Sequence, residues 1–154
     1  MKYWLVKSEP EIFSINDLEK SKNKTTCWDG VRNYQARNYM RDEMKIGDPV
    51  LFYHSNCEVP AVVGVCEVVK EGYPDFTAFD PKDVHYDPKS KKEEPTWVMA
   101  DIKLVKKFSK PVTLNEIKSK RSLCKIPLVQ MGNRLSVMPV GKEEYEEIIS
   151  MSLL

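Results

Sequence analysis

The densest group of side chains that can do chemistry lies in the run Trp28–Asn38, where a tryptophan and a glycine precede several amides and arginines. Such a tryptophan can stack on a flat heterocyclic ring, while asparagine and arginine hydrogen-bond the edge of that ring. The free N–H groups at the start of the helix expected there suit phosphate or carbonyl oxygens. This run therefore predicts a site for a flat ligand with a polar edge. The alternative is that Trp28 packs in the core while Arg32, Arg37 and Arg41 form surface ion pairs.

A second group stands at the end of a β-favouring run, where Tyr53, His54, Ser55 and Asn56 follow one another. Side chains at the end of a strand sit on a rigid scaffold and reach the rim of a pocket, so these four are candidate pocket residues. His54 and Cys57 also raise the alternative of a cysteine nucleophile, which needs a positioned base. Because residues three apart on a turn more often point in different directions, binding is the favoured interpretation.

Other reactive clusters carry weaker signals. A zinc site built from His54, Cys57, His85 and a further cysteine lacks the paired spacing of zinc ligands. The proline-rich stretch 72–96 holds four aspartates whose setting fits turn formation better than metal binding. They are Asp75, Asp80, Asp83 and Asp87. Since the chain also has no phosphate-binding glycine loop, zinc-protease motif or serine-hydrolase motif, the sequence predicts no metal, no cofactor and no catalytic residue.

These groups need a scaffold of short strands and short helices. The short connection between 50–55 and 61–70 indicates an antiparallel strand pair. Ser14 is a predicted N-cap, and Thr113 is another, with Glu116 three residues later. Further strands are expected at 3–7, 97–108 and 134–140, helices from 14 and over 33–43, 113–120 and 141–150, and a long ordered loop over 72–96. With no βαβ alternation, this order predicts an α+β fold on a small closed or nearly closed barrel.

The composition is that of one ordinary folded domain, predicted to span residues 1–154. The chain is 42% hydrophobic and 31% charged, and its net charge of +1 excludes nucleic-acid binding by bulk charge alone. Residues 82–125 nevertheless carry a net charge of +6, for which a solvated surface and a phosphate-facing role both stay open. No run is long enough to span a membrane, and the four cysteines form no C-x-x-C pair. We expect a protein that is not secreted, with reduced thiols.

Several motifs together resemble the EVE-domain family, whose members have a PUA-like fold. The matching segments cover nearly the whole chain and are Lys7–Pro10, Cys27–Asn38, Phe52–Asn56, Tyr73–Asp75, Tyr86–Pro88, Pro95 with Trp97, and Arg134–Val137. The resemblance implies a small, mostly antiparallel β-barrel with short flanking helices. EVE domains are thought to recognise modified bases in DNA, such as 5-methylcytosine. Where family members commonly have glutamine after Arg134–Val137, this chain has Met138, a departure that bears on specificity.

The resemblance also implies a base-binding pocket. Ser8 and Trp28 match, in motif order, positions of the pocket in the related YTH domains, and Phe52–Ser55 with Gly64 resembles its floor. The residues expected to contact the base are Ser8, Trp28, Asn33, Tyr53, His54, Ser55, Asn56, Tyr86 and Trp97. Those expected to contact phosphate are Arg32, Arg37, Arg41 and Arg134.

The favoured function is non-enzymatic binding of a modified DNA base, with no membrane partner. An RNA-binding module that reads a modified base is the first alternative, since PUA-like barrels often serve RNA. A glycosylase or nuclease is the second, and a small-molecule or regulatory module stays open. The location expected from this function is nuclear in a eukaryote and cytoplasmic in a bacterium. Affinity that depends on one stacked base should also change little with salt.

Overall fold

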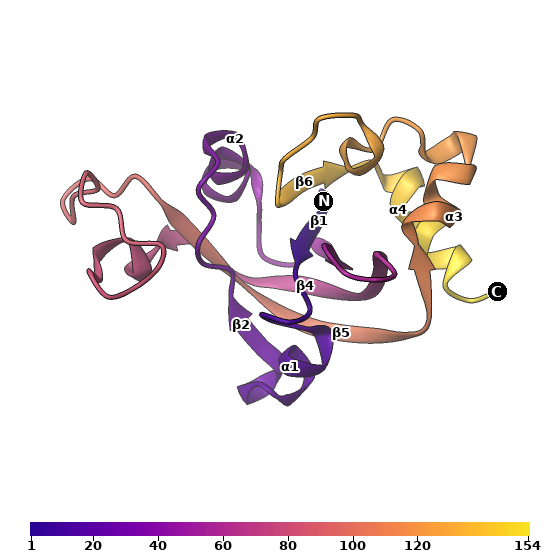
Figure 1. Ribbon diagram of the computed structural model, residues 1–154, viewed down its shortest axis with the longest axis horizontal. Helices are drawn as coiled ribbons and strands as arrows, with labels where there is room; N and C mark the ends of the chain where they lie inside the picture. The colour runs from indigo at the N-terminus through magenta and orange to yellow at the C-terminus, as the bar shows by residue number, and fades with distance from the viewer.

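A computed structural model describes all of residues 1–154, and a six-stranded sheet runs through its centre (Figure 1). The strands are β1 (Tyr3–Ser8), β2 (Thr25–Cys27), β3 (Pro49–His54), β4 (Ala61–Pro74), β5 (Val98–Thr113) and β6 (Val137–Val140). Their order is β2-β5-β4-β3-β1-β6. The α+β prediction is confirmed. The sheet is not closed, however, because β2 and β6 form two separate edges.

One pairing makes the sheet mixed. The first strand, β1, pairs in parallel with β3, in a register that sets Leu5 opposite Leu51, and antiparallel with β6. The remaining pairs are antiparallel, including the predicted β3–β4 pair. A parallel pair needs a long crossover, and here residues 9–48 provide it with two helices and β2. Those crossover residues supply much of the site described below.

The helices are short and begin where the sequence predicts. They are α1 (Ile15–Lys20), α2 (Tyr34–Asn38), α3 (Leu114–Ser119) and α4 (Lys142–Met151). Capping boxes start α1 at Ser14 and α3 at Thr113, as their spacing predicts. The expected helix over 33–43 is α2 followed by a π-helical turn, η2 (Tyr39–Glu43). Short 3-10 turns complete the chain: η1 (Lys22–Lys24), η3 (Phe76–Phe79), η4 (Arg121–Leu123) and η5 (Pro127–Val129).

Two parts of the scaffold differ from the prediction. The three-residue strand β2 pairs with β5 where the sequence indicated a loop. The strands β4 and β5 are longer than expected, so that Pro74 lies opposite Val98 and the predicted loop shortens to residues 75–97. These strand ends carry the loop away from the body of the molecule as a projecting arm (Figure 1).

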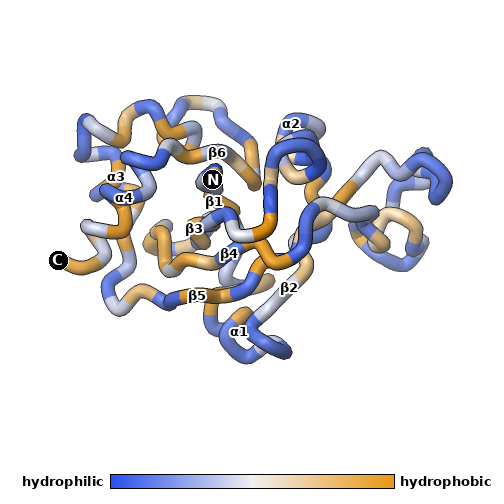
Figure 2. Tube along the Cα trace, turned by 180° about the vertical axis from the view of Figure 1, so that it is seen from behind, coloured by the Kyte–Doolittle hydropathy of each residue, from blue (hydrophilic) through white to orange (hydrophobic).

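The core lies between the sheet and the helices, with Trp4, Phe52 and Leu18 completely buried. Hydrophobic stretches gather on the central strands, whereas the tip of the arm and α1 are mostly hydrophilic (Figure 2). Gly64 lies in β4, where a Cβ would collide with the Ile15 side chain of α1 and with the Lys106 carbonyl oxygen of the paired strand β5, so glycine lets α1 pack closely on the sheet. No helix combines the length and the apolar character that crossing a membrane requires.

Candidate functional site

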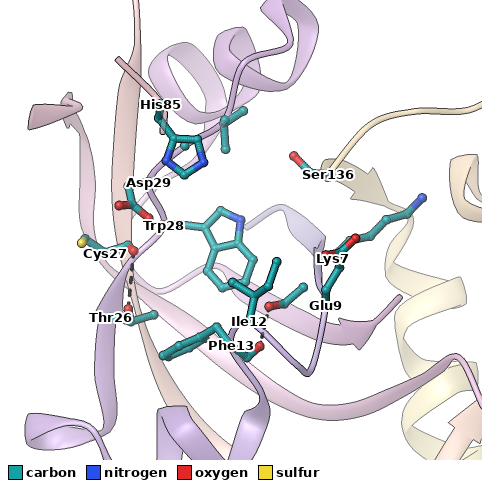
Figure 3. A pocket seen from close by; sticks show the side chains of 13 residues that line it. Lys7, Glu9, Ile12, Phe13, Thr26, Cys27, Trp28, Asp29, His85 and Ser136 are labelled. Carbon is teal, nitrogen blue, oxygen red and sulfur yellow. Dashed lines mark hydrogen bonds between the residues drawn. The ribbon is translucent and has the colours of Figure 1, made fainter. Parts of the chain in front are cut away.

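A cavity of about 440 Å³ opens between the β1–α1 connection, the end of β2, the arm and the segment before β6 (Figure 3). Its volume falls in the range of about 300–1,000 Å³ usual for small-ligand sites. Aromatic, aliphatic and charged side chains all line it. The lining residues are Lys7, Ser8, Glu9, Ile12, Phe13, Thr26, Cys27, Trp28, Asp29, Gly30, Val31, His85 and Ser136.

The indole of Trp28 extends into the middle of this cavity (Figure 3). The backbone N–H of Trp28 donates to the Ala100 carbonyl oxygen at 2.7 Å, which extends the β2–β5 pairing by one residue. Phe52 supports the ring from the core side, edge to face, with ring centroids 5.6 Å apart. No hydrogen bond in the structure uses the indole N–H of Trp28. One ring face and one donor are therefore available to a ligand.

Gly30 shapes the turn that follows Trp28. Its φ of +76° lies in the left-handed region, which glycine adopts without strain. A Cβ at this position would lie 2.6 Å from the imidazole of His85, so the ring packs directly on the bare backbone. The Gly30 N–H donates to Asp75 Oδ2 at 2.8 Å. The arm thus holds both the turn and the His85 side of the cavity.

A partly buried ion pair fixes the arm behind the cavity. Asp75 is completely buried, and its Oδ2 lies 3.0 Å from Arg32 Nη1. Arg32 also donates to the carbonyl oxygens of Val31 and His85 and to the Thr77 hydroxyl. Burial alone raises the pKa of Asp75, but hydrogen bonds from Thr77, Gly30 and Arg32 outweigh it and hold this pKa below its ordinary value. This network positions the cavity wall.

The charged groups at the cavity differ in their electrostatic state. Partial burial lowers the pKa of Lys7. Partial desolvation, together with the negative charge of Asp75, raises the pKa of Asp29. Burial and the charge of Asp29 likewise raise the pKa of the Cys27 thiol, which keeps it protonated at neutral pH. The cavity therefore presents a cation and carboxylates but no reactive thiolate.

A family model described as the EVE domain matches residues 2–151. The chain belongs to the EVE domain family. It is 46% identical to thymocyte nuclear protein 1 of Rattus norvegicus over 97% of this chain and 73% of the relative.

Solved structures agree with this membership. The EVE domain superposes on a hypothetical protein from Leishmania major with a TM-score of 0.93, at 50% identity over 99% of this chain and 95% of the other. It superposes on human THYN1 protein with a TM-score of 0.90, at 43% identity over 99% and 98%. That human structure is a complex with DNA containing 5-methylcytosine. The predicted fold family is confirmed.

Only two of the nine expected base contacts, Ser8 and Trp28, line the cavity of this EVE domain. Ser8 donates its hydroxyl to the carbonyl oxygen of Phe13, which bends the β1–α1 connection around the opening. The resemblance to related domains placed both residues in one pocket, both line this cavity, and their contact with a base stays a prediction. The other seven lie elsewhere, for reasons that the structure makes plain.

The four residues at the end of β3 support the cavity wall instead of lining it. Tyr53 is only 3% exposed, and burial raises its pKa to about 12. His54 accepts a hydrogen bond at Nε2 from the Ile15 backbone at the start of α1, and burial lowers its pKa. The Ser55 N–H donates to the carbonyl oxygen of Ser8. Asn56 donates its side-chain amide to Glu9 at 3.0 Å. The parallel pairing of β1 and β3 explains this supporting role.

The last three residues expected to contact the base also lie away from the cavity. Asn33 accepts a hydrogen bond from the Ala36 backbone N–H and so caps α2. Trp97 is 5% exposed and donates its indole N–H to Asp87. Tyr86 is 41% exposed on the arm but does not line the cavity. The departure from the family at Met138 is buried completely in β6, so it does not face the cavity either.

The four arginines expected to contact phosphate differ in whether partners within the protein engage their guanidinium groups. All five guanidinium donors of Arg32 are used inside the protein, which leaves none for a phosphate. Arg37 donates to the Thr96 carbonyl oxygen and to Asn38. Arg41 is paired with its neighbour Asp42 at 2.8 Å. Arg134 is exposed and makes no hydrogen bond or ion pair.

The aspartates of the arm form turns, as their setting predicts. Each accepts a hydrogen bond from the backbone N–H two residues later, the pattern of an Asx turn. The pairs are Asp75 with Thr77, Asp80 with Lys82, Asp83 with His85, and Asp87 with Lys89. No group of three histidine, cysteine or acidic side chains in the protein is placed to hold a metal ion.

Sequence reasoning missed most of the cavity lining. Lys7, Glu9 and Cys27 lie next to Ser8 or Trp28 in the family motifs. Ser136 lies inside the motif Arg134–Val137, so the motifs indicated this part of the lining. His85 had no comparable signal. Its place depends on how the arm folds back against Gly30, about fifty positions earlier in the chain.

Proposed function

We propose that this EVE domain binds DNA by taking one extruded, modified base of the 5-methylcytosine type into the Trp28 cavity, without catalysing a reaction on it. The observation that carries this proposal is the Trp28 indole, which offers an open face and an unpaired N–H in the middle of a preformed cavity. The similarity to human THYN1 protein, solved with 5-methylcytosine DNA, supports the choice of nucleic acid.

The cavity has the parts that a flipped cytosine requires. Stacking of a base on Trp28 contributes about 1–3 kcal/mol. The carboxylate of Asp29, on the cavity wall, suits the exocyclic amino group of cytosine as a hydrogen-bond acceptor. The apolar side chains of Ile12, Phe13 and Val31 line the same space and suit a methyl group. A single methyl contact contributes about 1 kcal/mol, so discrimination against plain cytosine should be modest.

The state of the cavity thiol supports binding without chemistry. Cys27 is the one cysteine in the lining, and its raised pKa keeps it neutral at physiological pH. His54, the histidine closest in sequence to Cys57, uses its Nε2 to accept from the Ile15 backbone. Cys27 is therefore not an activated thiolate, and the Nε2 of His54 is not free to act as the base that a cysteine nucleophile needs.

The direct test measures binding of the parent and Trp28→Ala to matched oligonucleotides with cytosine or 5-methylcytosine at one position. The parent should favour the modified strand, and Trp28→Ala should lose at least about tenfold in affinity, from the lost stacking. Thermal unfolding of both proteins shows whether the variant is folded. Equal binding by a folded Trp28→Ala would place the site elsewhere.

Two further measurements distinguish DNA binding from RNA binding and from an enzymatic activity. A matched RNA strand at the same salt concentration tests whether the 2′-OH is preferred. Incubation of modified duplex with the protein and divalent ions, followed by product analysis, tests for cleavage. A cleaved product that disappears in Asp29→Asn would replace the binding proposal with an enzyme.

A further inference from the structure

A second hollow lies beside the Trp28 cavity, and we call it the amide groove. It has a volume of about 380 Å³ and is formed by the start of α2 and the segment between η5 and β6. The side chains that shape it are Asn33, Gln35, Gln130, Met131, Asn133 and Arg134. Four are amides, one is an arginine and none is acidic.

Internal hydrogen bonds orient the amides of this groove. Asn33 and Asn133 each accept a backbone N–H with their side-chain oxygen, which leaves their NH₂ groups as donors. Gln35 donates to the Tyr39 hydroxyl, and Gln130 donates to a backbone carbonyl oxygen, which leaves their oxygens as acceptors. Donors and acceptors held in fixed places are the groups with which amide side chains read the edges of bases.

Arg134 supplies a charge that nothing in the protein neutralises. It is exposed and makes no ion pair or hydrogen bond, whereas Arg32, Arg37 and Arg41 all have internal partners. A free guanidinium in a groove without carboxylates suits a phosphate, which it can bind through two parallel N–H donors. Met131, fully exposed at the lip of the groove, adds a flexible apolar surface for the face of a base.

The same two chain segments border both hollows. Val31 lines the Trp28 cavity and Asn33 lines the groove; on the facing segment, Ser136 lines the cavity and Leu135 lines the groove. This shared border gives a strand whose base enters the cavity a short path to the groove. We propose that the amide groove binds the nucleotide next to the extruded base on the same DNA strand, with its phosphate at Arg134 and its base edge at the amides. This inference rests on the proposed function and adds a sequence-context preference to it.

The test varies the neighbours of the modified base. Single strands carry one central 5-methylcytosine, and the base on each side is changed in turn to each of the four. The parent should show a spread of about threefold to tenfold among neighbours on one side, the effect of one hydrogen bond to an amide. Gln35→Ala should remove most of that spread, because it deletes one acceptor from an exposed helix position that alanine suits.

The phosphate contact has a separate signature. Arg134→Ala should weaken binding to every strand to a similar degree and reduce the slope of log affinity against log salt by about 0.7. Arg121→Ala is the matched control, since Arg121 is also exposed and unpaired but does not line the groove. This control should bind as the parent does. Thermal unfolding checks that each variant is folded.

The outcomes distinguish failure of the amide-groove proposal from failure of the proposal that the Trp28 cavity binds a base. If Trp28→Ala loses binding while the parent shows no neighbour preference, the groove assignment is wrong and the cavity proposal stands. The groove assignment is also wrong if Arg134→Ala and Arg121→Ala change affinity equally. If Arg134→Ala weakens binding that does not depend on Trp28, both proposals fail, since the groove then binds a strand without an extruded base.

Discussion

Trp28 and Trp97 are the same residue type, were both expected in the base pocket, and have opposite surroundings. Trp97 is 5% exposed, stacks near Tyr34 with centroids 4.9 Å apart, and donates its indole N–H to Asp87 at 2.7 Å. Trp28 keeps its N–H unpaired and extends into a cavity. A tryptophan whose polar atom has a partner is part of the structure, whereas one whose polar atom is left open is available to a ligand.

The two regions depend on each other through the arm. Trp97 lies where the arm returns to the sheet, with the guanidinium of Arg32 5.2 Å from its ring centroid. Arg32 in turn holds Asp75, which fixes Gly30 two residues after Trp28. The region around Trp97 therefore helps to shape the cavity that Trp28 enters. Four measurements test this difference between Trp28 and Trp97.

Trp97→Ala should give the largest effect, a loss of about 3–5 kcal/mol in the free energy of unfolding, because it removes a large buried ring. Chemical denaturation measures the loss. Trp28→Ala is the matched variant and should lose clearly less, since its ring is only partly packed against the core. Equal losses of stability from the two variants would show that Trp28 is as much a part of the core as Trp97.

Asp75→Asn should destabilise the protein by about 2–4 kcal/mol. Each carboxylate oxygen accepts two donors: Oδ1 from the backbone and hydroxyl of Thr77, and Oδ2 from Gly30 and Arg32. An asparagine of the same shape must point its NH₂ at one of these donor pairs. Unfolding in urea measures the change, and Asp80→Asn on the exposed part of the arm is the control. An unchanged midpoint would show that Asp75 does not hold the arm.

Trp28→Phe should lower affinity for the modified oligonucleotide by about fivefold, because a smaller ring without an N–H keeps only part of the stacking. Trp97→Phe should leave affinity unchanged in any protein that remains folded. Titration by fluorescence anisotropy compares them. A larger loss from Trp97→Phe than from Trp28→Phe would reverse the roles assigned to the two rings.

The smallest expected effect is on the pH dependence of stability and comes from Asp87, which accepts the indole N–H of Trp97. The hydrogen bond from Trp97 and one from the Lys89 backbone lower the pKa of Asp87 in the folded protein. A carboxyl with a lowered folded pKa contributes stability above its unfolded pKa of about 3.9, and this contribution is lost as the pH falls through the folded value. The parent should therefore lose slightly more stability than Asp87→Asn between pH 6 and pH 3. Thermal unfolding at several pH values follows the difference.

Local signals in the sequence predicted much of the scaffold. The caps at Ser14 and Thr113 form as expected, because a capping box needs only residues three apart. The β3–β4 pair follows from a short connection. In contrast, β2 has three residues next to a lysine-rich stretch and no alternation, so only its pairing with β5 defines it. The parallel β1–β3 pair was missed because a long crossover hides it.

The candidate site was less predictable for a related reason. Residue type marks a side chain as capable of binding but not as open to solvent. Arg32 and Trp97 have suitable types, but their polar groups are engaged inside the protein, mainly by partners on the arm, which no spacing in the sequence reveals. His85 reaches the cavity only through the folded arm. Trp28 was found from its place beside a glycine turn, whereas Ser8 was implied only by the resemblance to the pocket of related domains.

The position of β1 between β3 and β6 has a consequence for the order of folding. During synthesis, β1 leaves the ribosome long before one of its two neighbours, β6 (Val137–Val140), has been made. Until that segment emerges, one edge of β1 has no partner, and the cavity lacks Ser136. A nascent chain stalled before residue 136 would therefore leave one edge of β1 unpaired beside an incomplete cavity, and ligand binding would appear only after residues 136–140 have emerged.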